Sequence, residues 1–332
     1  MKKSKNVIAW IFTIMFAMLT FSGCMSDAVD SGAVQAESTL SVQESYDTTE
    51  LTDIITEISD TAEINAAQTE GQIIELSKNQ VTAKSTAAKN KKSVKSTFSI
   101  HFIDVGQADA ALVECDGHYM LIDGGDRSHS SFVVSYLQQA GITALDYVLI
   151  SHYDADHVSG VIGALYQFDV GNVLSPDYSA DTKIYQSYVN CLKKQNITPV
   201  HPQVGDTYIL GNASFTVVCP DRYDYEEENN RSLGIRLTDS SHSFLILGES
   251  AMLNENLDLS ADVYMVSHHG SASSSTEKFL RAVHPAFAVI SVGADNDYGH
   301  PAQKTLSRLE AQDIQILRTD LSGTITAYST PD

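Results

Sequence analysis

Seven consecutive residues, 151–157, contain four side chains that could bind a metal ion. They are His152, Asp154, Asp156 and His157. The apolar run 147–150 before them predicts a strand, and the run 158–168 after them predicts a helix. A strand-to-helix turn brings its side chains toward one point, and mixed imidazole and carboxylate ligands suit Zn²⁺, Mn²⁺ or Fe. We therefore interpret the segment as a metal site and not as a solvated acidic loop, because further His-rich motifs follow downstream.

The other motifs occur in a fixed order along the chain. They are residues 102–110, 123–125, 267–271 and 299–301, with residues 229–232 and 247–249 between them. Together with 151–157, this ordered set resembles the metallo-β-lactamase superfamily, and most closely the hydrolase domain of ComEC-type competence proteins. The resemblance spans roughly residues 98 to 330. It implies an αββα sandwich, with a metal site at the sheet edges and hydrolysis by metal-activated water.

The resemblance also implies a set of site residues. The family pattern His-x-His-x-Asp-His falls on 152–157, with Asp154 in place of the usual second histidine. The bridging carboxylate falls on Glu249, where aspartate is usual, and the remaining ligands fall on His269 and His300. The resemblance implies two divalent ions, Zn²⁺ or Mn²⁺, one held by His152, Asp154, Glu249 and His269, and the other by Asp156, His157, Glu249 and His300. Such a pair could clamp a phosphoryl group.

Several nearby residues have roles that the sequence leaves open. We expect Asp156 and His268 to act in catalysis, with His268 as a proton donor or a support for a ligand, although a surface histidine without a role is an alternative. Asp104 and Asp109 flank a glycine-containing turn and could orient ligand imidazoles. The run 123–125 is typical of a turn with positive φ. Asn230 and Ser232 match a pocket-lining family segment, but capping roles are equally open.

The composition of the chain limits the classes of partner and of site that we expect. The chain has 332 residues, 21 Lys and Arg against 42 Asp and Glu, and a formal net charge of −21. This charge argues against tight electrostatic binding of nucleic acid, but not against a phosphodiester held by metal ions. Beyond Cys24 only Cys115, Cys191 and Cys219 remain, without a CxxC pair. A disulfide framework and a cysteine-based zinc site are therefore not expected.

The N-terminal region predicts export. Residues 1–24 combine basic residues, an apolar run and Ser-Gly-Cys, and they resemble a bacterial lipoprotein signal that would place a lipid on Cys24. The alternatives are ordinary secretory cleavage and an uncleaved anchor. Each of these three interpretations places the rest of the chain outside the cytoplasm. Residues 25–96 are polar, acidic and then basic, and we expect a disordered spacer. Strand and helix signals alternate over residues 97–332, and we expect one hydrolase domain with two sheets and outer helices.

These observations lead to three functional hypotheses. The first is an extracellular, lipid-anchored or secreted, metal-dependent phosphodiesterase or nuclease. The second keeps the site but takes a cell-surface phosphodiester of the teichoic-acid type. The third is a catalytically silent surface protein that binds metal. No protein partner is inferred, and the membrane is reached through Cys24.

Overall fold

The computed structural model describes residues 71–77, 80–84, 98–251 and 256–329. The signal expected at residues 1–24 lies outside the described residues, and so do residues 25–70, 78–79 and 85–96 of the spacer expected over residues 25–96. Within the described residues, the strands form two sheets of eight and seven strands. No helix of the described residues is long and apolar enough to span a bilayer.

The first sheet contains both ends of the described chain. Its strands are, in spatial order, β2 (Gln80–Lys84), β1 (Ile73–Ser77), β15 (Ile325–Ser329), β3 (Phe98–Phe102), β4 (Ala111–Cys115), β5 (His118–Ile122), β6 (Ala144–Leu149) and β7 (Asp169–Leu174). β1 runs parallel to β15, whereas β3, β4 and β5 form an antiparallel meander. Alternation sets the faces: Phe98, Ile100 and Phe102 of β3 point into the core.

The second sheet contributes the other half of the sandwich. Its order is β14 (Gln315–Arg318), β13 (Phe287–Ile290), β12 (Val263–Met265), β11 (Ser243–Ile246), β10 (Gly234–Thr238), β9 (Ala213–Cys219) and β8 (Thr207–Leu210). β11 to β14 are parallel to one another, so their carboxyl ends meet at one edge. Apolar side chains of both sheets form a shared core between them.

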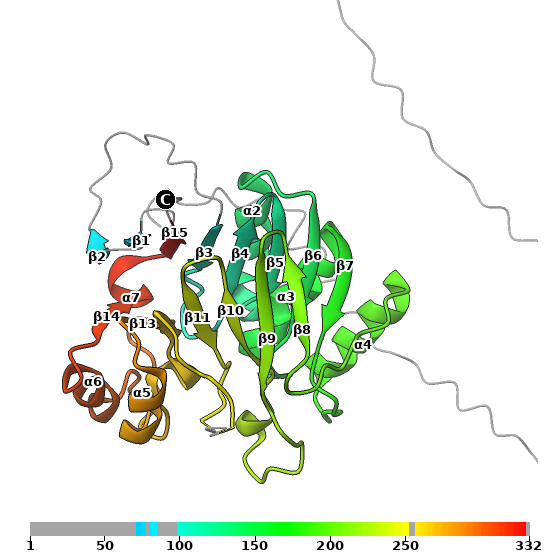
Figure 1. Cartoon of the computed structure of the whole chain (residues 1–332). Coiled ribbons are helices and arrows are strands. Elements are labelled where there is room, and N and C mark those ends of the chain that lie inside the picture. The colour runs from blue at the N-terminus through cyan, green and yellow to red at the C-terminus, as the bar shows by residue number, and fades with distance from the viewer. Residues whose placement is uncertain (1–70, 78–79, 85–97, 252–255, 330–332) are drawn as a thin grey trace, which may run out of the picture. The chain divides into compact units, whose positions relative to one another are not determined.

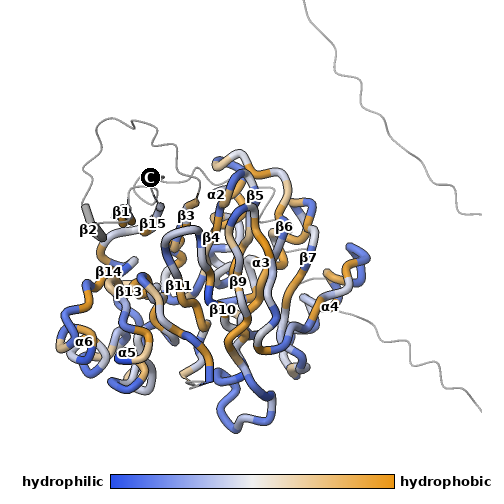
Figure 2. Tube along the Cα trace, in the orientation of Figure 1, coloured by the Kyte–Doolittle hydropathy of each residue, from blue (hydrophilic) through white to orange (hydrophobic). Residues whose placement is uncertain are grey.

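Helices cover the outer face of each sheet (Figure 1). α2 (Ser130–Gln139), α3 (Ala155–Gln167) and α4 (Lys183–Gln195) pack on the first sheet through a second apolar cluster. α5 (Glu277–Val283) and α6 (Gln303–Glu310) pack on the second through a third cluster. The short α7 (Thr319–Ser322) connects β14 to β15. The expected αββα sandwich is thus confirmed, and Figure 2 shows apolar residues along the strands, whereas the outer helices α4 and α6 carry both polar and apolar residues.

The structure corrects one boundary of the expected spacer. Residues 73–77 and 80–84, predicted to belong to a disordered spacer ending at 96, form β1 and β2 of the first sheet. The side chains of Ile74 and Leu76 are fully buried in the central core. The prediction was wrong here because a five-residue strand in a polar segment carries too little apolar pattern to stand out. Its partner, β15, lies some 250 residues away.

Candidate metal centre

The candidate ligands come from the carboxyl ends of strands in both sheets. His152 follows β6, and Asp156 and His157 lie in the first turn of α3. Glu249 follows β11, and His269 lies in the short 3-10 turn η4 (Ser267–Gly270) after β12. Because β11 and β12 are parallel neighbours, Glu249 and His269 reach the same edge. The site therefore lies between the two sheets at one end of the sandwich.

The first group of ligand atoms is compact and mostly buried. It comprises Asp156, His157, Glu249 and His269, whose ligand atoms all lie within 4.8 Å of one another. The Nε2 atom of His269 lies 3.3 Å from Oε1 of Glu249 and 3.5 Å from Oδ2 of Asp156. The Nε2 atom of His157 lies 3.7 Å from Oε1 of Glu249. Two imidazoles and two carboxylates thus surround one point.

The second group shares Glu249 with the first. The Nε2 atom of His152 lies 3.5 Å from Oε2 of Glu249 and 3.6 Å from Oδ2 of Asp154. His152 is buried, whereas Asp154 is exposed. The two oxygens of Glu249 therefore face two different sets of ligands, as a bridging carboxylate would. Within the described residues, this second group offers fewer ligands than the first.

The geometry corrects the division of ligands that the resemblance implied. His269 was expected with His152 and Asp154, but its Nε2 atom lies with Asp156, His157 and Glu249. His300 belongs to none of the three groups of ligand atoms found in the described residues, the third being Asp109, Asp123 and His157. Its ring lies 5.6 Å from that of His268 and 6.5 Å from that of His269, so it stands beside the first group. Sequence order alone does not determine which side of a turn a side chain faces.

Buried ring nitrogens without a partner indicate that these residues fit metal ions. The Nε2 atoms of His152, His157 and His269 are buried and make no hydrogen bond. A buried polar atom without a partner is costly, typically about 1–3 kcal/mol. Three such atoms converge on the oxygens of Glu249 and Asp156. Divalent cations would satisfy all of them, and the donor set suits Zn²⁺ or Mn²⁺.

The opposite nitrogen of each imidazole is held by the fold. The Nδ1–H of His157 donates to Oδ2 of Asp123 at 2.9 Å. The Nδ1–H of His152 donates to Oγ of Ser151 at 3.0 Å, and that hydroxyl donates to Asp123 at 2.6 Å. Such bonds fix the tautomer that leaves the Nε2 lone pair free for a metal. Sequence reasoning treated Asp123 only as part of a turn; its φ of 53° confirms the turn, but the carboxylate has this further role.

His269 is oriented in the same way from two other loops. Its Nδ1–H donates to the backbone oxygen of Ser291 at 2.9 Å, and Asp109 Oδ1 lies 3.4 Å from the same nitrogen. The expectation that Asp109 orients a ligand agrees with this contact. Asp104 does not share that position, because its carboxylate accepts from the backbone N–H of Gly106.

The loop before β10 supports Glu249 and His268. The backbone N–H of Glu249 donates to Oγ of Ser232 at 3.2 Å, and that of Ala251 donates to Oδ1 of Asn230 at 3.1 Å. Asn230 and Ser232 thus hold the segment carrying the bridging carboxylate. Asn229, which sequence reasoning did not single out, donates from Nδ2 to Nδ1 of His268 at 3.3 Å.

The site keeps its carboxylates charged. Burial opposes ionisation of Glu249, but the neighbouring imidazoles of His157 and His269 outweigh burial and hold its pKa well below the usual range. Burial also opposes ionisation of Asp156, yet the same two imidazoles lower its pKa to about 2. Both side chains are therefore anionic at neutral pH, which is the form that binds metal.

The His-His turn holds a strained backbone. His268 and His269 both have left-handed conformations, with φ of 52° and 48°. Such conformations cost of order 1–3 kcal/mol for a non-glycine residue, and they cluster at functional sites. Here the strain directs His269 inward while His268 stays about one-third exposed, with its Nε2 atom 3.9 Å from Oε1 of Glu249.

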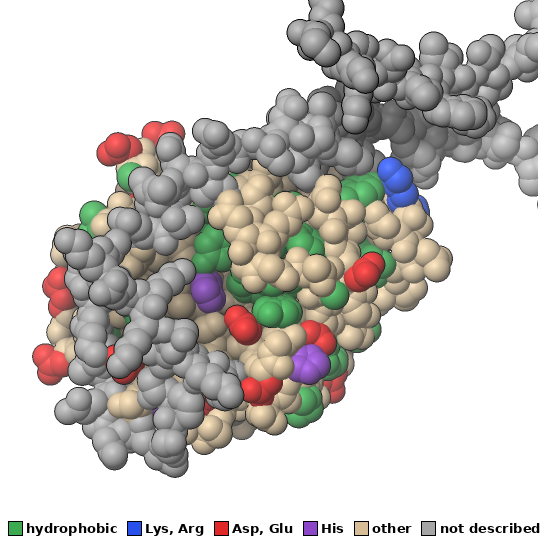
Figure 3. Space-filling view, turned by 90° about the horizontal axis from the view of Figure 1, so that it is seen from above, with side chains coloured by type: hydrophobic (Ala, Val, Ile, Leu, Met, Phe, Trp, Pro, Cys, Tyr) green, Lys and Arg blue, Asp and Glu red, His purple; other side chains and the backbone are tan. Residues whose placement is uncertain are grey.

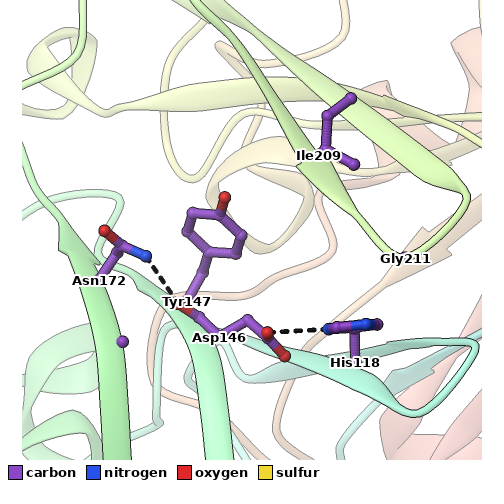
Figure 4. A pocket seen from close by; sticks show the side chains of 7 residues that line it. His118, Asp146, Tyr147, Asn172, Ile209 and Gly211 are labelled. Carbon is purple, nitrogen blue, oxygen red and sulfur yellow. Dashed lines mark hydrogen bonds and ion pairs between the residues drawn. The ribbon is translucent and has the colours of Figure 1, made fainter.

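A separate hollow lies at the opposite end of the sheets. It measures about 290 Å³ and is lined by His118, Asp146, Tyr147, Gly171, Asn172, Ile209 and Gly211 (Figure 4). The His118 and Asp146 side chains there form a 2.9 Å pair. On the face drawn in Figure 3, Lys and Arg gather at one edge, while Asp, Glu and His lie among uncharged side chains.

Comparison with known proteins agrees with this arrangement. Residues 103–294 match the metallo-beta-lactamase superfamily. The chain belongs to the metallo-beta-lactamase superfamily. The matched range contains each candidate ligand except His300, and it excludes β1 and β15 of the sandwich.

The curated relatives of this superfamily member include competence proteins. ComE operon protein 3 of Bacillus subtilis (strain 168) is 28% identical over 250 residues, which cover 68% of this chain and 32% of that protein. Competence protein ComA of Neisseria gonorrhoeae is 28% identical over 230 residues, covering 67% and 31%. The chain thus matches about a third of the length of these relatives. The metallo-beta-lactamase fold protein YhfI of Bacillus subtilis aligns with a TM-score of 0.48 at 12% identity, covering 69% of this chain and 99% of that one.

Proposed function

We propose that this protein is a metal-dependent phosphodiesterase with two metal ions, and that its substrate is nucleic acid. The observation that carries the proposal is the position of Glu249, whose two oxygens face separate ligand groups at 3.3 and 3.5 Å. A carboxylate between two ligand groups could help to hold two ions, and a pair of ions can stabilise both oxygens of a phosphoryl transfer. The competence proteins among its relatives support nucleic acid as the substrate class.

The residues of the site have distinct tasks in this reaction. Divalent ions held by the two groups would activate water and offset charge on the phosphoryl oxygens. Asp156 and Glu249 supply the anionic charge that holds the ions, and buried Asp123 and Asp109 keep the imidazoles in place. The Nδ2 atom of Asn229 lies 3.3 Å from Nδ1 and 3.5 Å from Nε2 of the His268 ring. The Nε2 atom of His268 lies 3.9 Å from Oε1 of Glu249, and we assign this imidazole the role of proton donor to the leaving oxygen.

Turnover tests this proposal against a silent metal-binding protein. The protein is stripped of metal, reloaded with Zn²⁺ or Mn²⁺, and offered an aryl phosphodiester, single-stranded DNA, RNA and teichoic acid. We expect metal-dependent cleavage of the aryl ester and of a nucleic acid. The Asp156→Ala variant should lose it, and His118→Ala, at the other end of the sheets, should keep it. Cleavage without metal, or unchanged cleavage by Asp156→Ala, would contradict the proposal. If teichoic acid is the polymer cleaved and nucleic acid is not, the substrate class is a cell-surface phosphodiester instead of nucleic acid.

We also propose that the protein is located on the outer face of the cell membrane and is anchored there by a lipid on Cys24. It is supported by the basic residues, the apolar run and Ser-Gly-Cys at the N-terminus. We expect Cys24→Ala to move the protein from the membrane fraction to the medium or to block its processing, with Cys115→Ala as the control. Normal maturation and an unchanged membrane fraction in Cys24→Ala would exclude the lipid anchor.

A further inference from the structure

Tyr298 presents an exposed aromatic ring beside the metal centre. Its side chain is 74% exposed, whereas most large apolar side chains of the described residues are buried. The ring stacks on that of His300, with centroids 5.7 Å apart and planes 25° from parallel. The His300 ring in turn lies 5.6 Å from that of His268. A row of rings therefore runs from the solvent to the candidate proton donor.

The loop that carries Tyr298 is held in place by one side chain. Oδ1 of Asn296 accepts from the backbone N–H of Tyr298 at 3.2 Å and of His300 at 3.0 Å. Nδ2 of Asn296 donates to the backbone oxygens of Gly293 at 2.9 Å and His300 at 2.7 Å. A ring on a loop braced in this way is pre-positioned. Because the loop is already ordered, a partner that stacks on the ring loses little binding free energy to ordering the loop.

The surroundings of the ring limit what can bind there. Asp295 and Asp297 precede Tyr298 on the same loop and are exposed, so they disfavour a phosphate group placed directly on the ring. A flat uncharged group would meet the ring face without that penalty. Quaternary ammonium ligands favour cages of several aromatic rings, and Tyr298 is the exposed aromatic ring on this loop. The near-parallel stack on His300 favours a further flat ring.

We propose that Tyr298 is the platform on which one unpaired nucleobase of the substrate stacks, next to the phosphodiester being cleaved. The inference rests on the proposed function and specifies its substrate as single-stranded nucleic acid. A base within a duplex is already stacked on both faces and cannot use the ring. A free base in a single strand can, and stacking of bases on aromatic side chains is tolerant of sequence. Tyr298 is thus a specificity-determining residue that positions the strand.

Kinetics of the metal-loaded full chain test the platform. The substrates are a single-stranded oligonucleotide and an oligonucleotide of equal length with abasic sites in place of its bases. We expect Tyr298→Ala to raise KM for the base-containing strand about tenfold, in line with the loss of one base–aromatic stack. KM for the abasic strand and the metal content should stay unchanged. Tyr298→Phe should behave as the parent, and so should Ile209→Ala, an exposed apolar control on β8.

The outcomes separate this inference from the proposed function. Equal KM values of Tyr298→Ala and parent on the base-containing strand would overturn the platform even if DNA is cleaved. So would an equal loss on both strands, which would mean that Tyr298 only supports His300. If the parent cleaves neither strand, the proposed function fails. The platform is then tested by binding alone, measured by fluorescence anisotropy with both labelled strands. Tighter binding of the base-containing strand that is lost in Tyr298→Ala supports the platform. Equal binding of the two strands would overturn the platform. A choline phosphodiester is a further probe: if Tyr298→Ala weakens its binding but not that of the base-containing strand, the platform is also overturned.

Discussion

Each buried ligand histidine in this site has one nitrogen committed to the fold and one directed to the centre. Asp123 holds His157 directly and His152 through Ser151, so a single carboxylate orients a ligand of each group. Such outer partners usually contribute 10- to 100-fold in metal affinity or activity. The chemistry of the centre would therefore depend on a residue outside the two ligand groups that meet at Glu249.

Replacing Asp123 by asparagine tests this dependence. The amide keeps the size of the side chain and tolerates the left-handed backbone at this position. However, an N–H facing Nδ1 of His157 would force the proton onto Nε2 and block the metal lone pair. We expect metal affinity to fall about 10- to 100-fold, measured by titration with Zn²⁺ or Mn²⁺. Asp146→Asn, in the pair at the far end, is the control. Equal affinities in both variants would show that Asp123 only shapes the turn.

At the scale of elements, the site depends on close contact between α3 and the loop after β5. Gly124 donates from its backbone N–H to the oxygen of His157 at 2.7 Å, and Gly160 donates to Gly125 at 3.3 Å. A Cβ atom at Gly160 would lie 1.8 Å from the backbone oxygen of Gly124. Only glycine lets the helix carrying Asp156 and His157 approach this loop so closely.

Gly160→Ala should therefore push α3 away from the loop. Helix propensity alone favours alanine by about 1 kcal/mol, so a fall in Tm would report the steric contact. We expect a lower Tm together with weaker metal binding, because His157 and Asp123 move apart. Gln167→Ala, at an exposed position in the last turn of the same helix, should leave both unchanged. A Tm of Gly160→Ala equal to or above that of the parent would contradict the packing argument.

Elements with strong local signals were predictable from the sequence, and those defined by distant pairing were not. The ligand residues stand at strand ends, where apolar runs stop and His and Asp cluster, so they could be located before the fold was known. β1 could not, because its pairing with β15 leaves no local trace. The sequence indicated His269 as a ligand but not the ligand group that it joins, because the left-handed backbone of the His-His turn sets the direction of its side chain. Tyr298 had no signal beyond a tyrosine in a polar loop.

At the scale of the whole molecule, the N-terminal part of the described chain belongs to the sandwich. β1 lies between β2 and β15 in the first sheet, and its residues alternate between half-buried and buried. Adding this strand extends the shared core beyond the range that matches the superfamily. The stability of the sandwich should thus depend on residues that composition alone would assign to a linker.

Two adjacent isoleucines of β1 test this claim within one strand. Ile74 is fully buried between the sheets, whereas Ile73 is half-buried on the other face. We expect Ile74→Ala to lower the free energy of unfolding by about 2 kcal/mol or more, and Ile73→Ala to lower it less. Urea unfolding of the full chain measures both. Equal, negligible effects would mean that the segment is a spacer after all.

The central claim is that Glu249 joins two metal ions in one site. The most direct measurement is the metal content per chain after equilibration with Zn²⁺ or Mn²⁺, by elemental analysis, in the parent, Glu249→Gln and Glu310→Gln. Glutamine keeps the shape of Glu249 but removes its charge and one of its two oxygens as a ligand, so the fold should persist. We expect about two ions per chain in the parent and in Glu310→Gln, on the exposed face of α6, and one or none in Glu249→Gln. Two ions retained by Glu249→Gln, or none bound by the parent, would contradict it.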